Sequence, residues 1–345
     1  SHAHIHQKMS RVIHHYPGSS WLLLLIVVVV VFLCATTTIT TINAHVAVDV
    51  DGDDDPVVSF SGIPTTIWPQ PSIYHVSMNS STLGIVSDQI FSSVSKIKIT
   101  PPTPDAKEVQ VALSKMPILQ KALTRYTRYV FPSLGSEHYV LSYDQANRWS
   151  TFIPRAHQSE AQGLRQITIQ SLNIVLKSQD TSMVNVNTDE SYELEVPDSS
   201  KSSDKSTTVT ITAQNQWGAV RALETLAQLI VPTVVEQQKK VVLHSIPSLP
   251  VSIQDKPRYQ WRGIMIDLAR HFLPVEQVLS IIDAMSYEKF NKLHLHLIDA
   301  QSFPVEIPQY EALATKGSFA PGLTYSTKQM KHIVSYANER GIEVI

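Results

Sequence analysis

The chain has 345 residues, of which 43% are hydrophobic and 17% are charged, and its formal net charge is -2 at neutral pH. This length exceeds that of one average domain, and the apolar content is sufficient for a sizeable core. Because there is no surplus of basic residues, the composition disfavours a nucleic-acid partner. The single cysteine, Cys34, allows no disulfide within the chain and identifies no compartment.

The first 45 residues contain an unbroken apolar run, 21–34, with Lys8 and Arg11 before it and small residues around Ala44 after it. This order of basic, apolar and small residues is typical of a secretory signal peptide. The run is shorter than the roughly 20 apolar residues that a membrane span needs. We therefore expect residues 1–45 to be a cleaved signal, or alternatively a signal-anchor that stays in the membrane. Both interpretations place the protein in the secretory pathway.

Residues 46–67 are expected to form an acidic linker. Within it, 49–55 (DVDGDDD) lacks the closing glutamate of a calcium-binding loop, so solvated chain is the preferred interpretation. Asn79 begins the pattern Asn-Ser-Ser, which is an acceptor sequence for N-glycosylation and agrees with secretion.

Residues 68–250 are predicted to form an α+β auxiliary domain with an antiparallel sheet. The β-rich stretches are 167–177, 191–196 and 207–213, and a polar turn between the last two predicts a hairpin. The 3.6-residue spacing of apolar side chains predicts helices at 118–130 and 217–231. The adjacent acids Asp189 and Glu190 are expected in a solvated turn rather than in a catalytic pair.

From residue 257 onward, strands and helices alternate. Strands are predicted at 261–268, 292–299 and 342–345, and helices from Pro274 and over 326–340, with Gly341 as the cap of the second helix. This alternation is typical of parallel β/α units. Three strands cannot close a (β/α)8 barrel. The predicted fold class is thus an α+β auxiliary domain followed, over 257–345, by an incomplete TIM barrel, and we expect coding sequence to be missing after Ile345.

In β/α barrels, functional groups lie at the carboxyl ends of the strands. This rule selects 267–271 (DLARH) and the segment from Asp299 to Glu306. A structural alternative is a salt bridge that joins loops, for example Asp267 with Arg270 or Arg262. A further pair, His294 and His296, shares one strand face. Two histidines are too few for a metal site, so we expect both to be packed and hydrogen-bonded, with no metal bound. A metal-dependent amidohydrolase is kept as an alternative function.

These segments carry a family resemblance. The runs PRYQWRGIMID (257–267) and ARHFLP (269–274) resemble the first barrel strand of glycoside hydrolase family 20, and KFNKLHLHLID (289–299) resembles its second unit. Shorter matches follow in order at 302–304, 316–318 and 336–342. Upstream, WPQP (68–71) and WGAVRALET (217–225) resemble the family's auxiliary domain. The chain is most similar in these motifs to the eukaryotic lysosomal-type β-hexosaminidases.

The resemblance implies hydrolysis of terminal, non-reducing N-acetylglucosamine or N-acetylgalactosamine from glycoconjugates or chitooligosaccharides. It implies a retaining mechanism in which the acetamido oxygen of the substrate attacks the anomeric carbon. No cofactor is expected. The implied location is the lysosome, the vacuole or the extracellular space, the implied partner is a glycan, and the full-length form is expected to be a homodimer.

The resemblance also assigns residues. Arg262 matches the arginine that holds the hydroxyl groups of the sugar, and Asp299 matches the acid at the end of the second strand. A guanidinium suits this task because it presents several fixed donors. Replacing Arg262 by lysine in an active form is then expected to weaken sugar binding.

The catalytic Asp-Glu pair of the family would lie after Ile345, so no catalytic residue is expected within this chain and the fragment alone is expected to be inactive. Two residues depart from the family pattern. Ala300 stands where a second acid is usual, and Leu295 stands where an aromatic residue is usual. These departures leave open a second hypothesis, that of a non-catalytic glycan-binding or membrane-anchored relative.

Overall fold

The computed structural model describes residues 73–76, 82–100, 108–131, 165–235 and 240–345. All of these lie in one compact unit that covers residues 64–345. The predicted signal segment, the acidic linker and the glycosylation pattern at Asn79 lie outside the described residues. In the part of the chain that is described, no helix is long and apolar enough to cross a bilayer.

The first part of the described chain forms a ten-stranded sheet, here called the mixed sheet. Its main path runs β1-β10-β6-β7-β5-β2-β9-β8, while β3 pairs with β5 and β4 with β3. The strands are β1 (Ile73–Val76), β2 (Thr82–Val86), β3 (Lys96–Ile99), β4 (Val109–Ala112), β5 (Arg165–Leu176), β6 (Tyr192–Val196), β7 (Ser206–Ala213), β8 (Val231–Val235), β9 (Lys240–Ile246) and β10 (Val251–Asp255).

The predicted hairpin is confirmed, because β6 and β7 are antiparallel, with Leu194 opposite Ile211. The expectation of a wholly antiparallel sheet is wrong. Strand β5 is parallel to three neighbours, namely β2, β3 and β7. Alternation of apolar and polar residues reports which face of a strand is buried, but it carries no information on strand direction.

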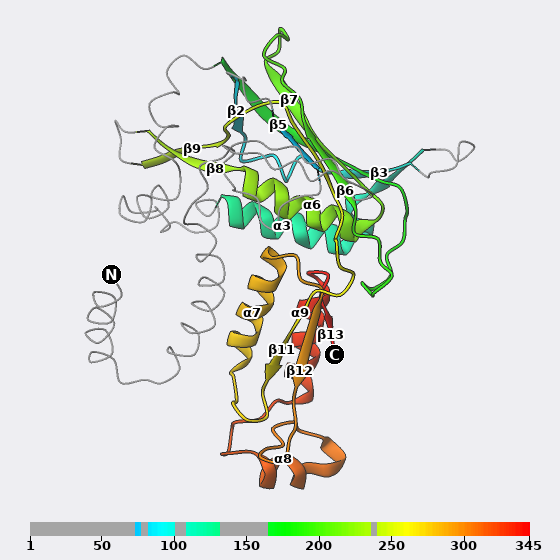
Figure 1. Ribbon diagram of the computed structural model, residues 1–345, viewed down its shortest axis with the longest axis vertical. Helices are drawn as coiled ribbons and strands as arrows, with labels where there is room; N and C mark the ends of the chain where they lie inside the picture. Colours follow the sequence, from blue (N-terminus) through cyan, green and yellow to red (C-terminus); the bar gives the residue numbers. More distant parts are fainter. Residues whose placement is uncertain (1–72, 77–81, 101–107, 132–164, 236–239) are drawn as a thin grey trace, which may run out of the picture. The chain divides into compact units, whose positions relative to one another are not determined.

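Helices α3 (Pro117–Val130) and α6 (Gln216–Leu229) lie side by side across one face of the mixed sheet (Figure 1). Helix α6 begins where the Asn215 side chain accepts hydrogen bonds from the backbone N–H groups of Trp217 and Gly218. Protein surrounds α6 on nearly all sides, and its buried residues include Arg221 and Glu224. A charged side chain in such a position requires partners, because an unpaired buried charge is costly.

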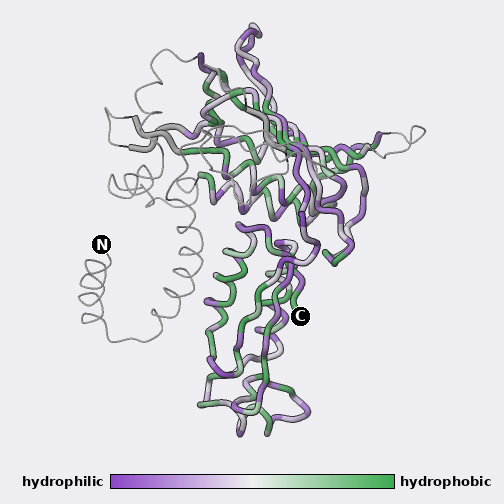
Figure 2. Tube along the Cα trace, viewed as in Figure 1, coloured by the Kyte–Doolittle hydropathy of each residue, from purple (hydrophilic) through white to green (hydrophobic). Residues whose placement is uncertain are grey.

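The second part of the described chain, here called the β/α region, has the order β11-β12-β13 in a parallel sheet. Its elements are β11 (Gly263–Asp267), α7 (Val275–Tyr287), β12 (Lys292–His296), η4 (Pro308–Tyr310), α8 (Glu311–Gly317), α9 (Thr327–Asn338) and β13 (Glu343–Val344). The predicted parallel β/α units are confirmed. Apolar residues lie along α7 (Figure 2), and they pack with residues of β12 and α9 into one core that includes Ile282, Leu293 and Ile333.

Gly341, the predicted cap after α9, has a backbone φ of +69°, a conformation that favours glycine. A Cβ atom at this position would also approach the Arg221 guanidinium and the Trp217 ring to 3.1 Å each. Gly341 thus ends α9 and at the same time allows α6 to lie close to the turn before β13.

Four side chains join the mixed sheet to the β/α region and are called here the Glu190 cluster: Glu190, Arg221, Arg262 and Asn291. The Glu190 carboxylate is 2% exposed and accepts hydrogen bonds from Arg221 Nε at 2.8 Å, Arg262 Nη2 at 2.5 Å and Asn291 Nδ2 at 3.1 Å. The expectation of a solvated acid pair therefore holds for Asp189, which is exposed, but is wrong for Glu190. Sequence alone did not reveal that two distant arginines converge on one turn.

Burial by itself raises the pKa of Glu190, but the Arg221 and Arg262 guanidinium groups outweigh burial, and the net pKa is lowered. The carboxylate is thus held in its ionised form. The folded state gains stability from this carboxylate above the pKa of an unfolded glutamate and loses it as the pH falls through the lower folded-state pKa.

We predict that Glu190→Gln lowers the free energy of unfolding by about 3–5 kcal/mol, because it leaves buried guanidinium groups without a counter-charge. Glu195→Gln, on the exposed face of β6, the strand that follows Glu190, is the matched control and should change stability by no more than about 0.5 kcal/mol. Urea unfolding at neutral pH measures both. The difference in the free energy of unfolding between the wild type and the Glu190 variant should become smaller in acid, where the wild-type carboxylate is protonated. Equal stability of the two variants would contradict the role of this cluster.

Candidate functional site

Four polar side chains meet where β11 and β12 end, and they are called here the carboxyl-end cluster: Asp267, Arg270, His296 and Asp299. Strand β11 ends at Asp267 and β12 ends at His296, and these two residues are direct partners in the parallel register. Because parallel strands place their carboxyl ends at one edge of a sheet, the turns that follow both strands are neighbours. The rule that selected these two segments from the sequence therefore holds in the structure.

The turn after β11 is fixed by hydrogen bonds to both strands. The Asp267 carboxylate accepts from the backbone N–H groups of Ala269 and Arg270, at 3.1 and 2.9 Å. The backbone carbonyl of His296 accepts from Leu268 and Ala269, at 2.9 and 3.1 Å. This turn directs Arg270 toward the end of β12.

Arg270 bridges two carboxylates. Its Nε donates to Asp267, and its Nη1 donates to Asp299 Oδ2 at 2.6 Å. The salt bridge between Asp267 and Arg270 that the sequence offered as a structural alternative is present, and it forms part of the same cluster as Asp299. Bidentate and branched contacts of this kind orient a guanidinium, whose donors lie in one plane.

The turn after β12 holds Asp299. Asp299 and Ser302 exchange two backbone hydrogen bonds, at 3.1 and 3.2 Å, so the backbone of this turn is closed on itself. The Asp299 carboxylate accepts from the Ala300 N–H at 2.6 Å through Oδ1, and its Oδ2 lies 2.8 Å from His296 Nε2. The carboxylate is therefore held by neighbours on three sides.

The cluster is charged and open to solvent. Hydrogen bonds from His296, then from the Ala300 N–H, lower the pKa of Asp299, and the backbone N–H of Arg270 is the main cause of a lowered pKa at Asp267. The Asp267 hydrogen bond raises the pKa of Arg270. The side chains of Arg270 and Asp299 are 43% and 26% exposed. The site thus offers guanidinium donors next to carboxylate acceptors, an arrangement suited to neutral ligands with neighbouring hydroxyl groups.

A cavity of about 360 Å³ runs along β12 and the loop after it. Its walls include His296, Ile298, Phe303 and Val305. An apolar wall beside a few convergent polar groups is the usual composition of a small-molecule site.

Arg262 lies at the other end of the strands. It precedes Gly263, the first residue of β11, and its side chain is 17% exposed. Besides the contact with Glu190, its Nε donates to the carbonyl of Lys289 at 2.9 Å and its Nη1 to that of Tyr259 at 2.8 Å. The two residues that the family resemblance assigned to the sugar, Arg262 and Asp299, are thus not brought together. Arg270 stands beside Asp299 instead, and its position after an apolar strand was the sequence signal for it.

The other residues singled out in the sequence are separate from the cluster or at its margin. His294 is exposed, and among the described residues its side chain has no hydrogen bond or ion pair. Glu306 accepts a hydrogen bond from Thr324 at 2.6 Å. Among the described residues, no three His, Cys, Asp or Glu side chains are placed to hold a metal ion.

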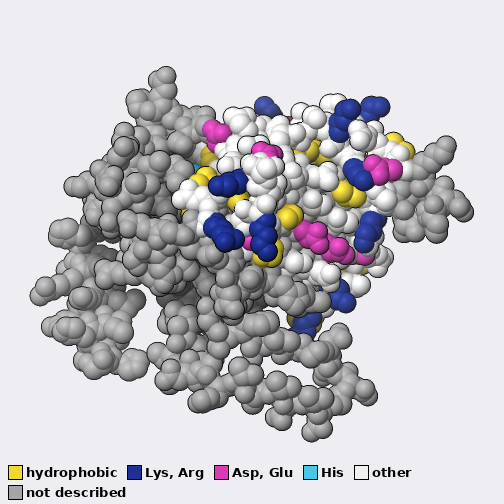
Figure 3. Space-filling model, turned by 90° about the horizontal axis from the view of Figure 1, so that it is seen from above, with side chains coloured by type: hydrophobic (Ala, Val, Ile, Leu, Met, Phe, Trp, Pro, Cys, Tyr) yellow, Lys and Arg dark blue, Asp and Glu magenta, His cyan; other side chains and the backbone are white. Residues whose placement is uncertain are grey.

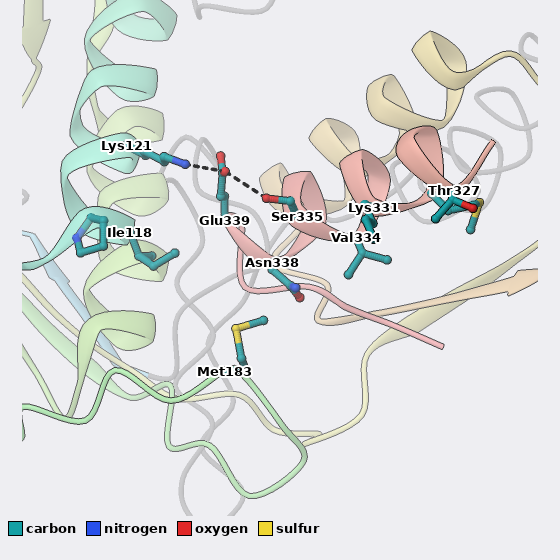
Figure 4. A pocket seen from close by; sticks show the side chains of 11 residues that line it. Ile118, Lys121, Met183, Thr327, Lys331, Val334, Ser335, Asn338 and Glu339 are labelled. Carbon is teal, nitrogen blue, oxygen red and sulfur yellow. Dashed lines mark hydrogen bonds and ion pairs between the residues drawn. The ribbon is translucent and has the colours of Figure 1, made fainter. Parts of the chain in front are cut away.

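A larger cavity, of about 590 Å³, lies between α3 and α9 (Figure 4). Its walls are mainly apolar, with Ile118, Met183 and Val334 among them, and Lys121 forms an ion pair with Glu339 at 2.6 Å on one side. None of its lining residues belongs to the carboxyl-end cluster. On the described part of the face shown in Figure 3, Lys and Arg lie scattered among uncharged side chains with Asp and Glu beside them, and they do not form a single basic surface.

Comparison with known proteins identifies the class. Residues 259–345 match the model of the catalytic domain of glycosyl hydrolase family 20, and residues 67–229 match a family described as beta-acetyl hexosaminidase like. The parallel β/α region, with its polar cluster at the carboxyl edge, corresponds to the first of these, and the mixed sheet from β1 to β7 with helices α3 and α6 corresponds to the second. The chain therefore belongs to glycoside hydrolase family 20, whose members are glycoside hydrolases.

Curated relatives agree with this assignment. Beta-hexosaminidase subunit A1 of Dictyostelium discoideum is 38% identical over 194 residues, covering 56% of this chain and 33% of that protein. Human beta-hexosaminidase subunit beta is 29% identical over 279 residues, covering 81% of this chain and 42% of that protein. The chain thus spans about a third to two-fifths of the length of these relatives.

Among solved structures, a chitobiase from Flavobacterium johnsoniae has a TM-score of 0.51 and 24% identity, and the match covers 81% of this chain and 34% of that one. At this identity the likeness concerns the fold alone. It supports a mixed α/β chain of the family 20 type.

We predict different effects when Arg270 and Arg262 are each replaced by lysine in an active enzyme that contains this region. Arg270→Lys should raise KM for a β-N-acetylglucosaminide roughly 10-fold or more, because lysine cannot reproduce the branched contacts with two carboxylates. Arg262→Lys should lower the midpoint of thermal unfolding and leave KM unchanged, because Arg262 precedes the amino end of β11, away from the carboxyl-end cluster, and its guanidinium pairs with the buried Glu190. Steady-state kinetics and thermal unfolding of both variants distinguish them. If KM rose in the Arg262 variant and not in the Arg270 variant, the prediction would be contradicted and Arg262 would be the sugar-binding arginine.

Proposed function

We propose that this chain is part of a β-N-acetylhexosaminidase that removes terminal, non-reducing N-acetylhexosamine from glycoconjugates or chitooligosaccharides. The observation that carries the proposal is the carboxyl-end cluster in a chain of family 20. An arginine and two carboxylates at this edge match the needs of a pyranose, whose neighbouring hydroxyl groups both donate and accept hydrogen bonds.

In this proposal, Arg270 and Asp299 bind two adjacent hydroxyl groups of the terminal sugar. Arg270 already reaches Asp299 at 2.6 Å, so a hydroxyl pair placed over both groups would receive a hydrogen bond from one and donate to the other. Asp267 keeps the guanidinium in this orientation. The sugar ring would lie toward the cavity along β12, whose apolar wall suits the less polar face of a pyranose.

The chemical step is proposed to be substrate-assisted. Family 20 is an exception to the usual two-carboxylate scheme, since the acetamido oxygen of the substrate serves as the nucleophile and the anomeric configuration is retained. We infer that an Asp-Glu pair on a later strand of a completed (β/α)8 barrel orients the acetamido group and protonates the leaving oxygen. The residues of this chain then bind the sugar, and none of them is the general acid.

The cellular setting follows from the N-terminal sequence. The apolar run 21–34 and the acceptor pattern at Asn79 support passage through the secretory pathway, with the lysosome, the vacuole or the extracellular space as destination. A homodimer of the full-length form is part of the same proposal. Attachment to a membrane would require that the N-terminal segment is retained.

A second candidate function is glycan binding without turnover. It is favoured by Ala300, which offers a backbone N–H but no carboxylate beside Asp299. The metal-dependent alternative gains no support from His296, since its Nε2 faces the Asp299 carboxylate.

We predict that the purified 345-residue chain shows no turnover of a chromogenic N-acetyl-β-glucosaminide, because general acid catalysis alone contributes roughly 100- to 10,000-fold. The same chain joined to a family 20 continuation with the Asp-Glu pair should turn the substrate over and release the β-anomer first, as ¹H NMR of the product would show. Turnover by the 345-residue chain, or first release of the α-anomer, would contradict the proposed division of roles. Sugar binding without turnover by the joined protein would favour the glycan-binding alternative.

A further inference from the structure

His296 has two separate roles in the geometry of the carboxyl-end cluster. Its backbone carbonyl accepts the N–H groups of Leu268 and Ala269 and so fixes the turn that carries Arg270. Its ring lies 2.8 Å from the carboxylate of Asp299, which belongs to the turn after β12. His296 thus contacts the first turn through its backbone carbonyl and the second turn through its ring.

Of these two contacts, a substitution at position 296 can remove only the one that the imidazole ring makes with Asp299. The backbone of the Asp299 turn is closed by its own two hydrogen bonds with Ser302. His296 is held in the ladder between β11 and β12 as the partner of Asp267, while β13 pairs with the beginning of β12, at Lys292 and Leu293. Loss of the imidazole would therefore leave both backbones in place and remove one of the three hydrogen bonds that hold the Asp299 carboxylate, since the Ala300 N–H and Arg270 Nη1 supply the other two.

We propose that His296 is the positioning residue that holds the Asp299 carboxylate beside Arg270 in the orientation that receives the sugar. This inference rests on the proposed function for its effect on the substrate, but the hydrogen bond itself does not. A rigid strand and a single side chain that orients a binding group form the kind of support that preorganised sites require.

The direction of the Asp299 pKa agrees with this geometry. The His296 hydrogen bond is the largest cause of the lowered pKa of Asp299, followed by the Ala300 N–H, with the Arg270 and His296 charges as smaller contributions. Asp267, on β11, is the other charged group at this edge, and it faces Arg270. A lowered pKa keeps Asp299 ionised in mildly acidic solution, and removing its main cause should raise that pKa toward the ordinary value for aspartate.

The first test measures activity in the catalytically competent enzyme. His296→Ala should raise KM for the chromogenic N-acetyl-β-glucosaminide roughly 10-fold, the size expected when one hydrogen bond to a charged group is lost, with a smaller change in kcat. His296→Gln should recover part of this loss, because its amide N–H can still donate to Asp299. His332→Gln, at an exposed histidine on α9, is the matched control and should leave KM unchanged.

A double-mutant cycle separates positioning from general structural damage. If His296 acts through Asp299, then Asp299→Asn and His296→Ala should be non-additive, and the double variant should be little worse than Asp299→Asn alone. The acid limb of the kcat/KM profile should also move to higher pH in His296→Ala. Additive losses, or an unmoved acid limb, would overturn the proposal.

A second measurement does not require turnover. In the 345-residue chain, ¹³C NMR of the Asp299 carboxyl, assigned by its loss in Asp299→Asn, should titrate at higher pH in His296→Ala than in the wild type. An unchanged midpoint would overturn the positioning role. If the carboxyl shifts as expected but the competent wild-type enzyme neither binds nor cleaves the hexosaminide, the proposed function fails and the positioning role stands.

Discussion

A buried carboxylate shared by two arginines holds the described part of this protein together. Glu190 lies in the turn before β6, Arg221 comes from the surrounded helix α6, and Arg262 precedes β11. Arg221 also donates to the carbonyl oxygens of Arg340 and Gly341, at 3.1 and 2.8 Å, so its guanidinium contacts the turn before β13 as well as Glu190. Because an unpaired charge in this position would be costly, the mixed sheet and the β/α region constrain each other.

A second buried contact strengthens the same junction. Lys289 Nζ, before β12, donates to Asp255 at 3.1 Å, to Tyr192 at 2.9 Å and to Thr225 at 2.7 Å. Burial lowers the pKa of this lysine, while the Asp255 carboxylate opposes the shift. The amino ends of β11 and β12 are therefore anchored by charge, which leaves their carboxyl ends free for a ligand. The separation of anchoring and binding ends explains why Arg262 and Arg270, eight positions apart in the printed sequence, have different surroundings.

Much of the fold follows from local sequence pattern, and the predictions about the fold that were wrong share one cause. Apolar spacing predicted α6 and α7, alternation predicted the β6–β7 hairpin, and Gly341 was recognised as a cap. Strand direction in the mixed sheet and the burial of Glu190 depend on contacts between residues far apart in sequence, such as the pair Glu190 and Arg262, which periodicity does not report. The assignment of Arg262 to the sugar stays a prediction. The strand-end rule selected the segments of Arg270 and Asp299, but the motif match favoured Arg262, whose place relative to the strand only the structure supplies.

We propose that the terminal sugar binds at the carboxyl-end cluster, with Arg270 and Asp299 as its direct contacts. The most direct measurement is a crystal structure of the competent enzyme with N-acetylglucosamine bound. We expect sugar hydroxyl groups within hydrogen-bond distance of the Arg270 guanidinium and the Asp299 carboxylate, with Arg262 still paired to Glu190. A sugar whose hydroxyl groups contact Arg262, or one bound away from the ends of β11 and β12, would contradict it.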